Sequence, residues 1–150
     1  MAVKSIPDGY HSLTPYLVVR DAAKAIEFYA KAFGAVELYR MPMGGKIGHA
    51  EMKIGDSIFM LADEFEGMSN PTPDKLGGTA VSLMIYLDDV DTVFKRAIGA
   101  GATEVRPVEN QFYGDRSGSL RDPFGHVWMV STHVEDVSPE EMQRRMAAMA

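Results

Sequence analysis

The sequence predicts an α+β fold in which two βαβββ units share one domain. Three observations predict it: the order strand, helix and three strands occurs twice, a loop-forming stretch separates the two runs, and landmarks recur at one spacing. Asp21 and Asp88 are 67 residues apart, and so are Gly34 and Gly101. A constant spacing through helix cap and helix stop is typical of an internal repeat. The alternative is a chance alignment of two amphipathic helices that both have Asp caps and Gly stops.

The first unit is expected at about residues 10–64. It begins with a β-branched and aromatic run, and Asp21 then stands where a helix N-cap accepts a backbone N–H. An apolar stripe follows at helical spacing, and Gly34 supplies a left-handed stop. The expected elements are a strand at 13–19, a helix at 22–33, and strands at 36–41, 47–54 and 57–62.

Residues 65–78 form the expected linker, because proline, asparagine and glycine are concentrated there. The second unit, at about 79–135, repeats the pattern with a capping pair, Asp88 and Asp89, and a helix stop at Gly101. The turn of Asp122, Pro123, Phe124 and Gly125 predicts a final hairpin. Its expected strands are 82–87, 104–108, 115–120 and 126–132, and a short amphipathic helix follows at 138–150.

Composition narrows the functional classes. The 150 residues suit a single domain, 1–150, with 46% apolar and 24% charged residues. A formal charge of -6 disfavours nucleic acid and anionic membranes as partners, since both attract a basic surface. The chain has no cysteine, which excludes disulfides, thiolate metal sites and cysteine nucleophiles. No run of about 20 apolar residues occurs, and we expect a cytoplasmic protein.

Four segments resemble the vicinal-oxygen-chelate superfamily, which includes glyoxalase I, the bleomycin and fosfomycin resistance proteins and the extradiol dioxygenases. They are LTPYLVVRDAAKAIEFYAKAFGA (13–35), GHAEMKIGDSIFML (48–61), SLMIYLDDVDTVFKRAIGAGA (82–102) and DPFGHVWMVST (122–132). The stretch YGDRSGSLRDPFGHVW resembles the sequences of a subgroup known only as glyoxalase-like proteins. The resemblance implies that two βαβββ modules pair into an eight-stranded, open, barrel-like cleft, and that the protein is a homodimer.

The resemblance also implies where a metal would bind. Metal-dependent members take ligands from the first and fourth strands of each unit, typically His, Gln, Glu or Tyr. The corresponding positions here are Thr14, Met60, Ser82 and Met129. Hydroxyls bind hard divalent cations weakly without carboxylates, and thioethers prefer soft Cu(I). We therefore expect no metal at the standard site, and no other cofactor.

His49 and Glu51 are the candidate catalytic pair. They are two residues apart in an expected strand, so their side chains share one face. If that face lines the cleft, an imidazole and a carboxylate lie together, which suits proton transfer. The alternative is a polar strand face that is simply solvated.

The remaining candidates are ligand-binding residues. Arg116 is suited to a carboxylate or phosphate and Tyr113 to stacking or donation, with Asp115 between them, although a local Asp–Arg surface pair is the alternative. We expect Arg116 and Tyr113 to share one cavity with the catalytic pair. Further lining residues are expected to be Thr14, Tyr16, Met60, Ser82, Tyr86 and Met129, since methionine packs adaptably and the others are small, hydroxylated or aromatic.

Two functional classes remain open on the sequence. One is a binding protein that holds a small, partly apolar molecule without a metal. The other is a lyase, isomerase or dioxygenase of the glyoxalase type, which would need a metal or acid–base pair from His49, Glu51 and Asp115. One fold hosts many chemistries, so the resemblance does not choose between them.

Overall fold

The computed structural model describes residues 2–150 and confirms an α+β fold with two βαβββ units. The first unit contains β1 (Tyr16–Val19), α1 (Ala22–Phe33), β2 (Val36–Met43), β3 (Lys46–Ile54) and β4 (Ser57–Asp63). The second contains β5 (Ser82–Tyr86), α3 (Val90–Gly99), β6 (Thr103–Asn110), β7 (Asp115–Arg121) and β8 (Val127–His133). A short α2 (Pro73–Leu76) lies between the units, and α4 (Pro139–Met149) follows the second.

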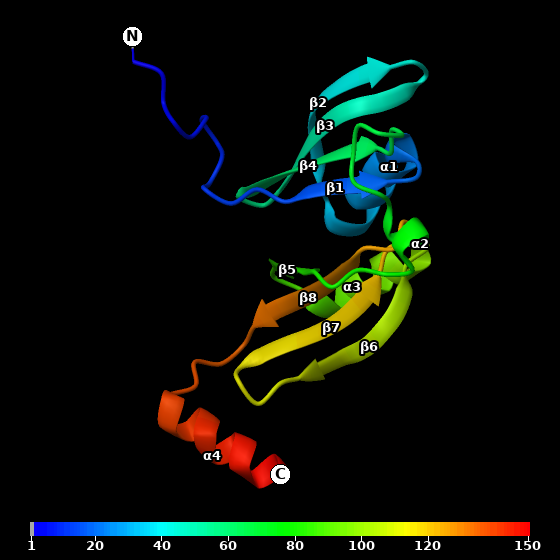
Figure 1. The fold of residues 1–150 in the computed structure, drawn as a ribbon. Coiled ribbons are helices and arrows are strands. Elements are labelled where there is room, and N and C mark those ends of the chain that lie inside the picture. The colour runs from blue at the N-terminus through cyan, green and yellow to red at the C-terminus, as the bar shows by residue number, and fades with distance from the viewer. Residues whose placement is uncertain (1) are drawn as a thin grey trace.

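Each unit forms one four-stranded sheet. Sheet A has the order β1-β4-β3-β2 and sheet B the order β5-β8-β7-β6. In both sheets the first strand pairs in parallel with the fourth, and the other pairs are antiparallel. Figure 1 shows sheet A with α1 above sheet B with α3, and α2 between them. The edge position of β6 explains how it tolerates Pro107, which has no N–H to donate.

Equivalent contacts fix the helix of each unit to the end of its fourth strand. The backbone N–H of Ala22 donates to Asp63 Oδ1 at 2.9 Å, and that of Val90 donates to Thr132 Oγ1 at 3.0 Å. Asp21 caps α1 as expected, and Gly34 ends it with a φ of 68°. These side chains satisfy N–H groups that a helix leaves unpaired at its start. Each helix therefore covers one face of its own sheet.

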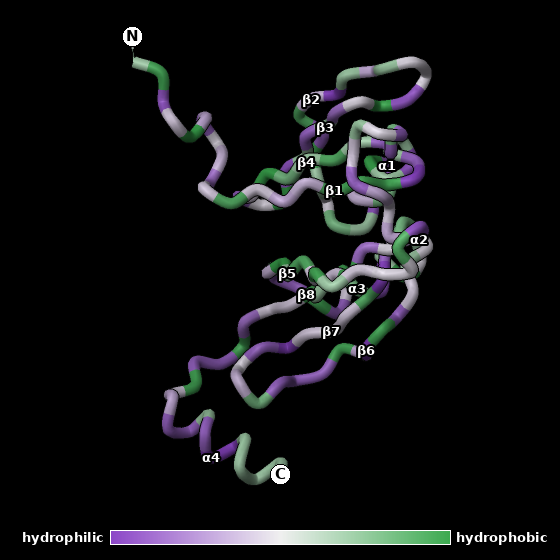
Figure 2. Tube along the Cα trace, viewed as in Figure 1, coloured by the Kyte–Doolittle hydropathy of each residue, from purple (hydrophilic) through white to green (hydrophobic). Residues whose placement is uncertain are grey.

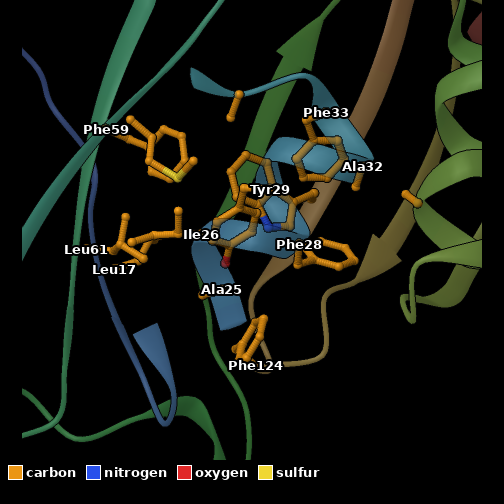
Figure 3. Close-up of a cluster of buried hydrophobic side chains, with 14 of the residues drawn as sticks. Leu17, Ala25, Ile26, Phe28, Tyr29, Ala32, Phe33, Phe59, Leu61 and Phe124 are labelled. Atoms are coloured by element: carbon orange, nitrogen blue, oxygen red, sulfur yellow. The ribbon is translucent and has the colours of Figure 1, made fainter. Parts of the chain in front are cut away.

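The hydrophobic core lies between the helices and the helix-covered sheet faces, and the two units share it. Tyr29 of α1 is fully buried, and its ring lies 5.5 Å from Phe59 and 5.4 Å from Trp128. Phe33 lies 4.8 Å from the Trp128 ring. Figure 3 shows the aromatic side chains of α1 beside Phe124, which comes from the turn before β8. The core therefore holds the two units together.

A buried carboxylate joins the units at this core. Asp122 is 3% exposed and accepts hydrogen bonds from the Tyr29 hydroxyl at 2.6 Å and from Trp128 Nε1 at 2.8 Å. It also accepts from the backbone N–H groups of Phe124 and His126. The turn that the sequence predicts is thus also the contact between the second unit and α1.

The stretch expected as an irregular linker contains one helical turn. The Thr72 side chain accepts from the N–H of Lys75, Pro73 occupies the first turn, and Gly77 ends α2 with a φ of 79°. Proline has no N–H to lose at a helix start, so this proline favours the turn instead of breaking it. None of the helices within residues 2–150 is long and apolar enough to cross a membrane.

The sheet faces opposite the helices, here called the open faces, carry exposed apolar side chains. On sheet A they include Tyr16, Tyr39 and Met41, which are 47–51% exposed. On sheet B, Met84 is 40% and Tyr86 59% exposed. Figure 2 shows hydrophobic residues along β4 and β5, whereas α4 is mostly hydrophilic. Both open faces are therefore available to a ligand or a second chain.

Removing the Tyr29 hydroxyl should weaken the contact between the units. In Tyr29→Phe, Asp122 stays buried with one donor fewer, so the free energy of unfolding should fall by about 1–3 kcal/mol. Urea denaturation measures this change. Tyr39→Phe, at a 51% exposed tyrosine, should change it by less than about 0.5 kcal/mol. Equal stability of both variants would show that the Tyr29 contact does not hold the units together.

Candidate functional site

A chain of hydrogen bonds runs across the open face of sheet A. The Tyr16 hydroxyl lies 2.8 Å from His49 Nδ1, and His49 Nε2 lies 2.9 Å from Glu51 Oε2. The other carboxylate oxygen of Glu51 accepts from the Tyr10 hydroxyl. The chain therefore joins the N-terminal segment, β1 and β3 through one imidazole and one carboxylate.

Strand register explains why these side chains meet. Met60 of β4 lies between its partners Tyr16 of β1 and Glu51 of β3, so all three share one face. The neighbouring Leu17 and Leu61 point to the helix-covered face and are buried. The alternation of β-strands thus places His49 and Glu51 together on the open face.

Hydrogen bonds and burial shift the pKa values of the groups in this hydrogen-bonded chain. Hydrogen bonds from Tyr10 and His49 lower the pKa of Glu51, which stays ionised near neutral pH. Burial and the Glu51 carboxylate raise the pKa of Tyr10 to about 12, and the same two causes raise the pKa of Tyr16. Because an ionised carboxylate only accepts hydrogen bonds, His49 Nε2 donates to Glu51. The Tyr16 hydroxyl is thus connected through the imidazole to an ionised carboxylate.

A cavity of about 560 Å³ adjoins Tyr16 on the same open face. Its walls include the methionine and aromatic side chains Met41, Met43, Phe65 and Met68. Cavities that bind small molecules commonly have about 300–1,000 Å³ and apolar walls with few polar groups. We call it the methionine cavity.

A second cavity, of about 310 Å³, lies between the units. It is bounded by residues of β1 and β5, which are edge strands of their sheets, and by the linker. The cavity is lined by Leu17 of β1 and Leu83 of β5, and on the linker side by Leu76 and Val81. We call it the linker cavity.

A second polar cluster lies on sheet B. Asp115, which is 3% exposed, accepts from the Tyr86 hydroxyl at 2.7 Å and contacts His133 Nδ1 at 2.8 Å. The other ring nitrogen of His133 lies 2.8 Å from Asp136, and these two carboxylates raise the pKa of His133. Neither of the two cavities described above includes this cluster in its walls.

Arg116 lies elsewhere than expected. It forms a two-pronged ion pair with Asp91 of α3, at 2.8 and 2.9 Å. A Cβ atom added to Gly118, on the same face of β7, would come within 2.9 Å of the Phe94 side chain of α3. This face therefore points to the helix, and the expectation that Arg116 shares a cavity with His49 is not met within the chain.

The other predicted lining residues are dispersed. Thr14 lies before β1 begins, and Ser82 is the first residue of β5, paired with Val127. Tyr113 lies in the turn between β6 and β7, with its ring 5.2 Å from Phe112. Of the lining residues predicted beside the catalytic pair, the structure brings Tyr16 and Met60 to the open face of sheet A. It brings Tyr86 and Met129 to that of sheet B.

Comparison with known proteins identifies the family. Residues 10–130 match the Glyoxalase/Bleomycin resistance protein/Dioxygenase superfamily. The chain belongs to this superfamily. The Mycobacterium bovis protein Mb0911c is 46% identical over 141 residues, which cover 91% of this chain and 93% of that protein.

Solved structures of the superfamily fold are also similar to this chain. TioX from Micromonospora sp. ML1 is 27% identical with a TM-score of 0.65, and the match covers 85% of this chain and 100% of TioX. The Arabidopsis thaliana protein At5g48480 is 25% identical with a TM-score of 0.66, over 81% of this chain and 98% of the other. Both likenesses extend across most of the two units.

The side chains do not fit the metal that many superfamily members use. The four positions that the resemblance assigns to a metal carry two hydroxyls, Thr14 and Ser82, and two thioethers, Met60 and Met129. Thr14 precedes β1, and strand register places Met60 beside Tyr16 and Met129 beside Met84. Tyr16 is hydrogen-bonded to His49. Among residues 2–150, no group of three or more His, Cys, Asp or Glu side chains is placed to hold a metal ion. Thioethers are poor ligands for hard divalent cations.

Two members of these clusters were missed on the sequence. Tyr10 lies 41 positions from Glu51, in a segment without periodicity, so no local pattern connects them. His133 has no partner at ligand spacing, and its contact with Asp115 depends on the register of β7 and β8. Both contacts arise from tertiary structure, and strand register could have indicated only the contact of His133.

The lowered pKa of Glu51 predicts how its contribution to stability depends on pH. A carboxyl with a lower pKa in the folded state stabilises the fold above its unfolded pKa, and loses that effect as pH falls through the folded pKa. Glu51→Gln should therefore lower the free energy of unfolding by about 1 kcal/mol at pH 7. Below about pH 4 the difference from the original chain should shrink.

Urea denaturation at pH 7 and pH 3 measures this difference. Glu104→Gln, at an exposed position of β6, is the matched control and should have little effect at either pH. A Glu51→Gln effect of the same size at both values would show that the ionised carboxylate is not the stabilising form.

Proposed function

We propose that this protein binds a small, largely apolar molecule in the methionine cavity, beside the hydrogen-bonded chain of Tyr16, His49 and Glu51. The observation that carries the proposal is the junction of the two features at Tyr16. This residue lines the cavity, and its hydroxyl contacts His49 Nδ1 at 2.8 Å. A ligand in the cavity thus has apolar walls and, at one edge, a polar group connected to an ionised carboxylate.

The walls support an adaptable rather than a rigid fit. Methionine side chains are unbranched and polarizable, and they pack against differently shaped apolar surfaces. Ser69 and Asn70 add uncharged polar groups at the loop side of the cavity. This favours a ligand with a hydrophobic body and few hydrogen-bonding groups. We expect the protein to act in the cytoplasm, in accordance with its acidic, cysteine-free composition.

An acid–base enzyme of the lyase or isomerase type is the second candidate, and the chain Tyr16–His49–Glu51 favours it. An imidazole held by a carboxylate can accept a proton from a substrate through Tyr16, since both of its ring nitrogens are already hydrogen-bonded. The substitution His49→Gln distinguishes the two candidates. A binding protein should keep its ligand affinity after this change, whereas an enzyme should lose turnover.

We also infer that the protein acts as a homodimer, because two open faces leave large apolar side chains in solvent. Tyr39, Met41, Met84 and Tyr86 are 40–59% exposed. Extended apolar patches on a chain commonly mark an interface. A partner chain would cover part of these faces and enclose the methionine cavity further.

Light scattering should give about twice the 16.5 kDa chain mass at micromolar concentration. Met84→Glu should shift the mass toward one chain, because a charge would be buried in the interface. Gln143→Glu, at an exposed position of α4, is the control and should keep the dimer. A single-chain mass for the original protein throughout this range would contradict the dimer.

The donor set predicts that divalent metals do not bind specifically. Protein purified without chelators should contain well under about one equivalent of metal, because thioethers bind such ions weakly. Added Zn²⁺, Ni²⁺ or Mn²⁺ should leave the melting temperature unchanged, since only a bound ion stabilises the folded state by mass action. Elemental analysis and thermal melts test this, and one tightly held equivalent would contradict metal-free binding.

Methyl 4-hydroxybenzoate is a suitable probe of the methionine cavity, since it is compact, uncharged and aromatic with one hydroxyl. Met43→Ala removes apolar wall and should weaken its binding about fivefold, equivalent to about 1 kcal/mol. Met146→Ala, at a 56% exposed methionine of α4, should leave binding unchanged. Calorimetric titration measures both, and failure of the original protein to bind would reject the cavity as the site.

A further inference from the structure

The methionine cavity and the linker cavity adjoin. Both are lined by Tyr16, Val18 and Asn70, so the two spaces meet where β1 passes the linker. The methionine cavity continues from there along the open face of sheet A, toward Met43. The linker cavity continues between the edge strands β1 and β5, toward Leu83.

The linker cavity offers an apolar environment with a firm wall. Pro71 and Pro73 form part of the wall, and between them Thr72 is 3% exposed and caps α2. His126 is the one titratable imidazole in the lining, and its Nε2 donates to the carbonyl oxygen of Val18 at 3.0 Å. On the linker side, Leu76 and Val81 add apolar surface, and Asn70 and Thr79 add uncharged polar groups.

Charged ligand groups find no partner in either cavity. Among the described residues that line them, none is a lysine or arginine, and Asp63 is the one carboxylate. The two oxygens of Asp63 already accept from the backbone N–H groups of Ala22 and Ile47. A buried charge without a partner is strongly unfavourable, so the linings favour an uncharged molecule.

We propose that the two cavities form one groove that takes an uncharged, elongated molecule, with a compact ring in the methionine cavity and an apolar tail in the linker cavity. The inference rests on the proposed function, since it assigns the ligand class of that site and adds a second subsite. Tyr16 and Asn70 stand where ring and tail join, and a polar linking group such as an ester or amide meets their side chains there. The total length, not only the ring, then determines affinity.

Two esters that differ only in their tails test the groove. Methyl 4-hydroxybenzoate fills the methionine cavity alone, and hexyl 4-hydroxybenzoate adds five methylene groups. We expect the hexyl ester to bind on the order of tenfold more tightly to the original protein, because the tail leaves water. Calorimetric titration with the full chain measures both affinities.

Variants at exposed linker positions separate the subsites. Leu76→Trp and Val81→Trp, at residues that are each 66% exposed, should fill the linker cavity and abolish the advantage of the hexyl ester. They should leave the methyl ester unaffected. Leu38→Trp, at a 48% exposed residue outside both linings, is the control and should keep the advantage. Thermal melts confirm that each variant is folded.

The outcomes distinguish the two proposals. If Leu76→Trp and Val81→Trp are folded and keep the advantage of the hexyl ester, the tail binds elsewhere and the groove is rejected, while the methionine cavity stands. Equal affinity of the two esters for the original protein also rejects the groove. If the original protein binds neither ester, the proposed function itself fails.

Discussion

The arrangement of the two units depends on one buried carboxylate. Asp122 is almost inaccessible to solvent and accepts hydrogen bonds from Tyr29, Trp128 and two backbone N–H groups. A buried carboxylate is tolerated only when its oxygens are satisfied, and one of these donors comes from the other unit. Sliding or rotating one unit would remove the Tyr29 hydroxyl and leave Asp122 short of a donor. The contact therefore selects one docking of the units, besides stabilising it.

That docking determines where the linker cavity lies. Because α1 meets the turn before β8 at the core, α1 and α3 also lie against each other. The edge strands β1 and β5 then border a common space, which the linker covers from outside. His126, next to the same turn, donates to the backbone of Val18 and holds β1 at this border. The linker cavity is thus a consequence of the core contact.

The sequence predicted what local pattern determines, and it failed where tertiary pairing decides. Period-two alternation placed His49 and Glu51 on one face, and the aspartate caps located the starts of both helices. The expected stop at Gly101 is wrong, because α3 already ends at Gly99 with Ala100 as its cap. Arg116 was placed on the wrong face of β7. Its two-residue spacing from Gly118 puts both on one face, and at Gly118 that face lies against α3. The partnership of Tyr29 with Asp122 spans 93 positions, and no spacing in the chain reveals it. The turn at Asp122 was recognised, but only as a local hairpin.

The two units retain the same scaffold while their open faces have diverged. Asp63 and Thr132 fix the two helices at corresponding places, so positions that hold the scaffold keep their role. The polar clusters do not correspond: Tyr16 lies beside Met60, whereas Tyr86 lies beside Ser131. In the first unit the cluster adjoins the methionine cavity through Tyr16, while in the second it leads to the segment before α4. A repeat that keeps its helix contacts but changes its open faces is free to place binding mainly in one unit, and our proposal places the ring of the ligand beside the first.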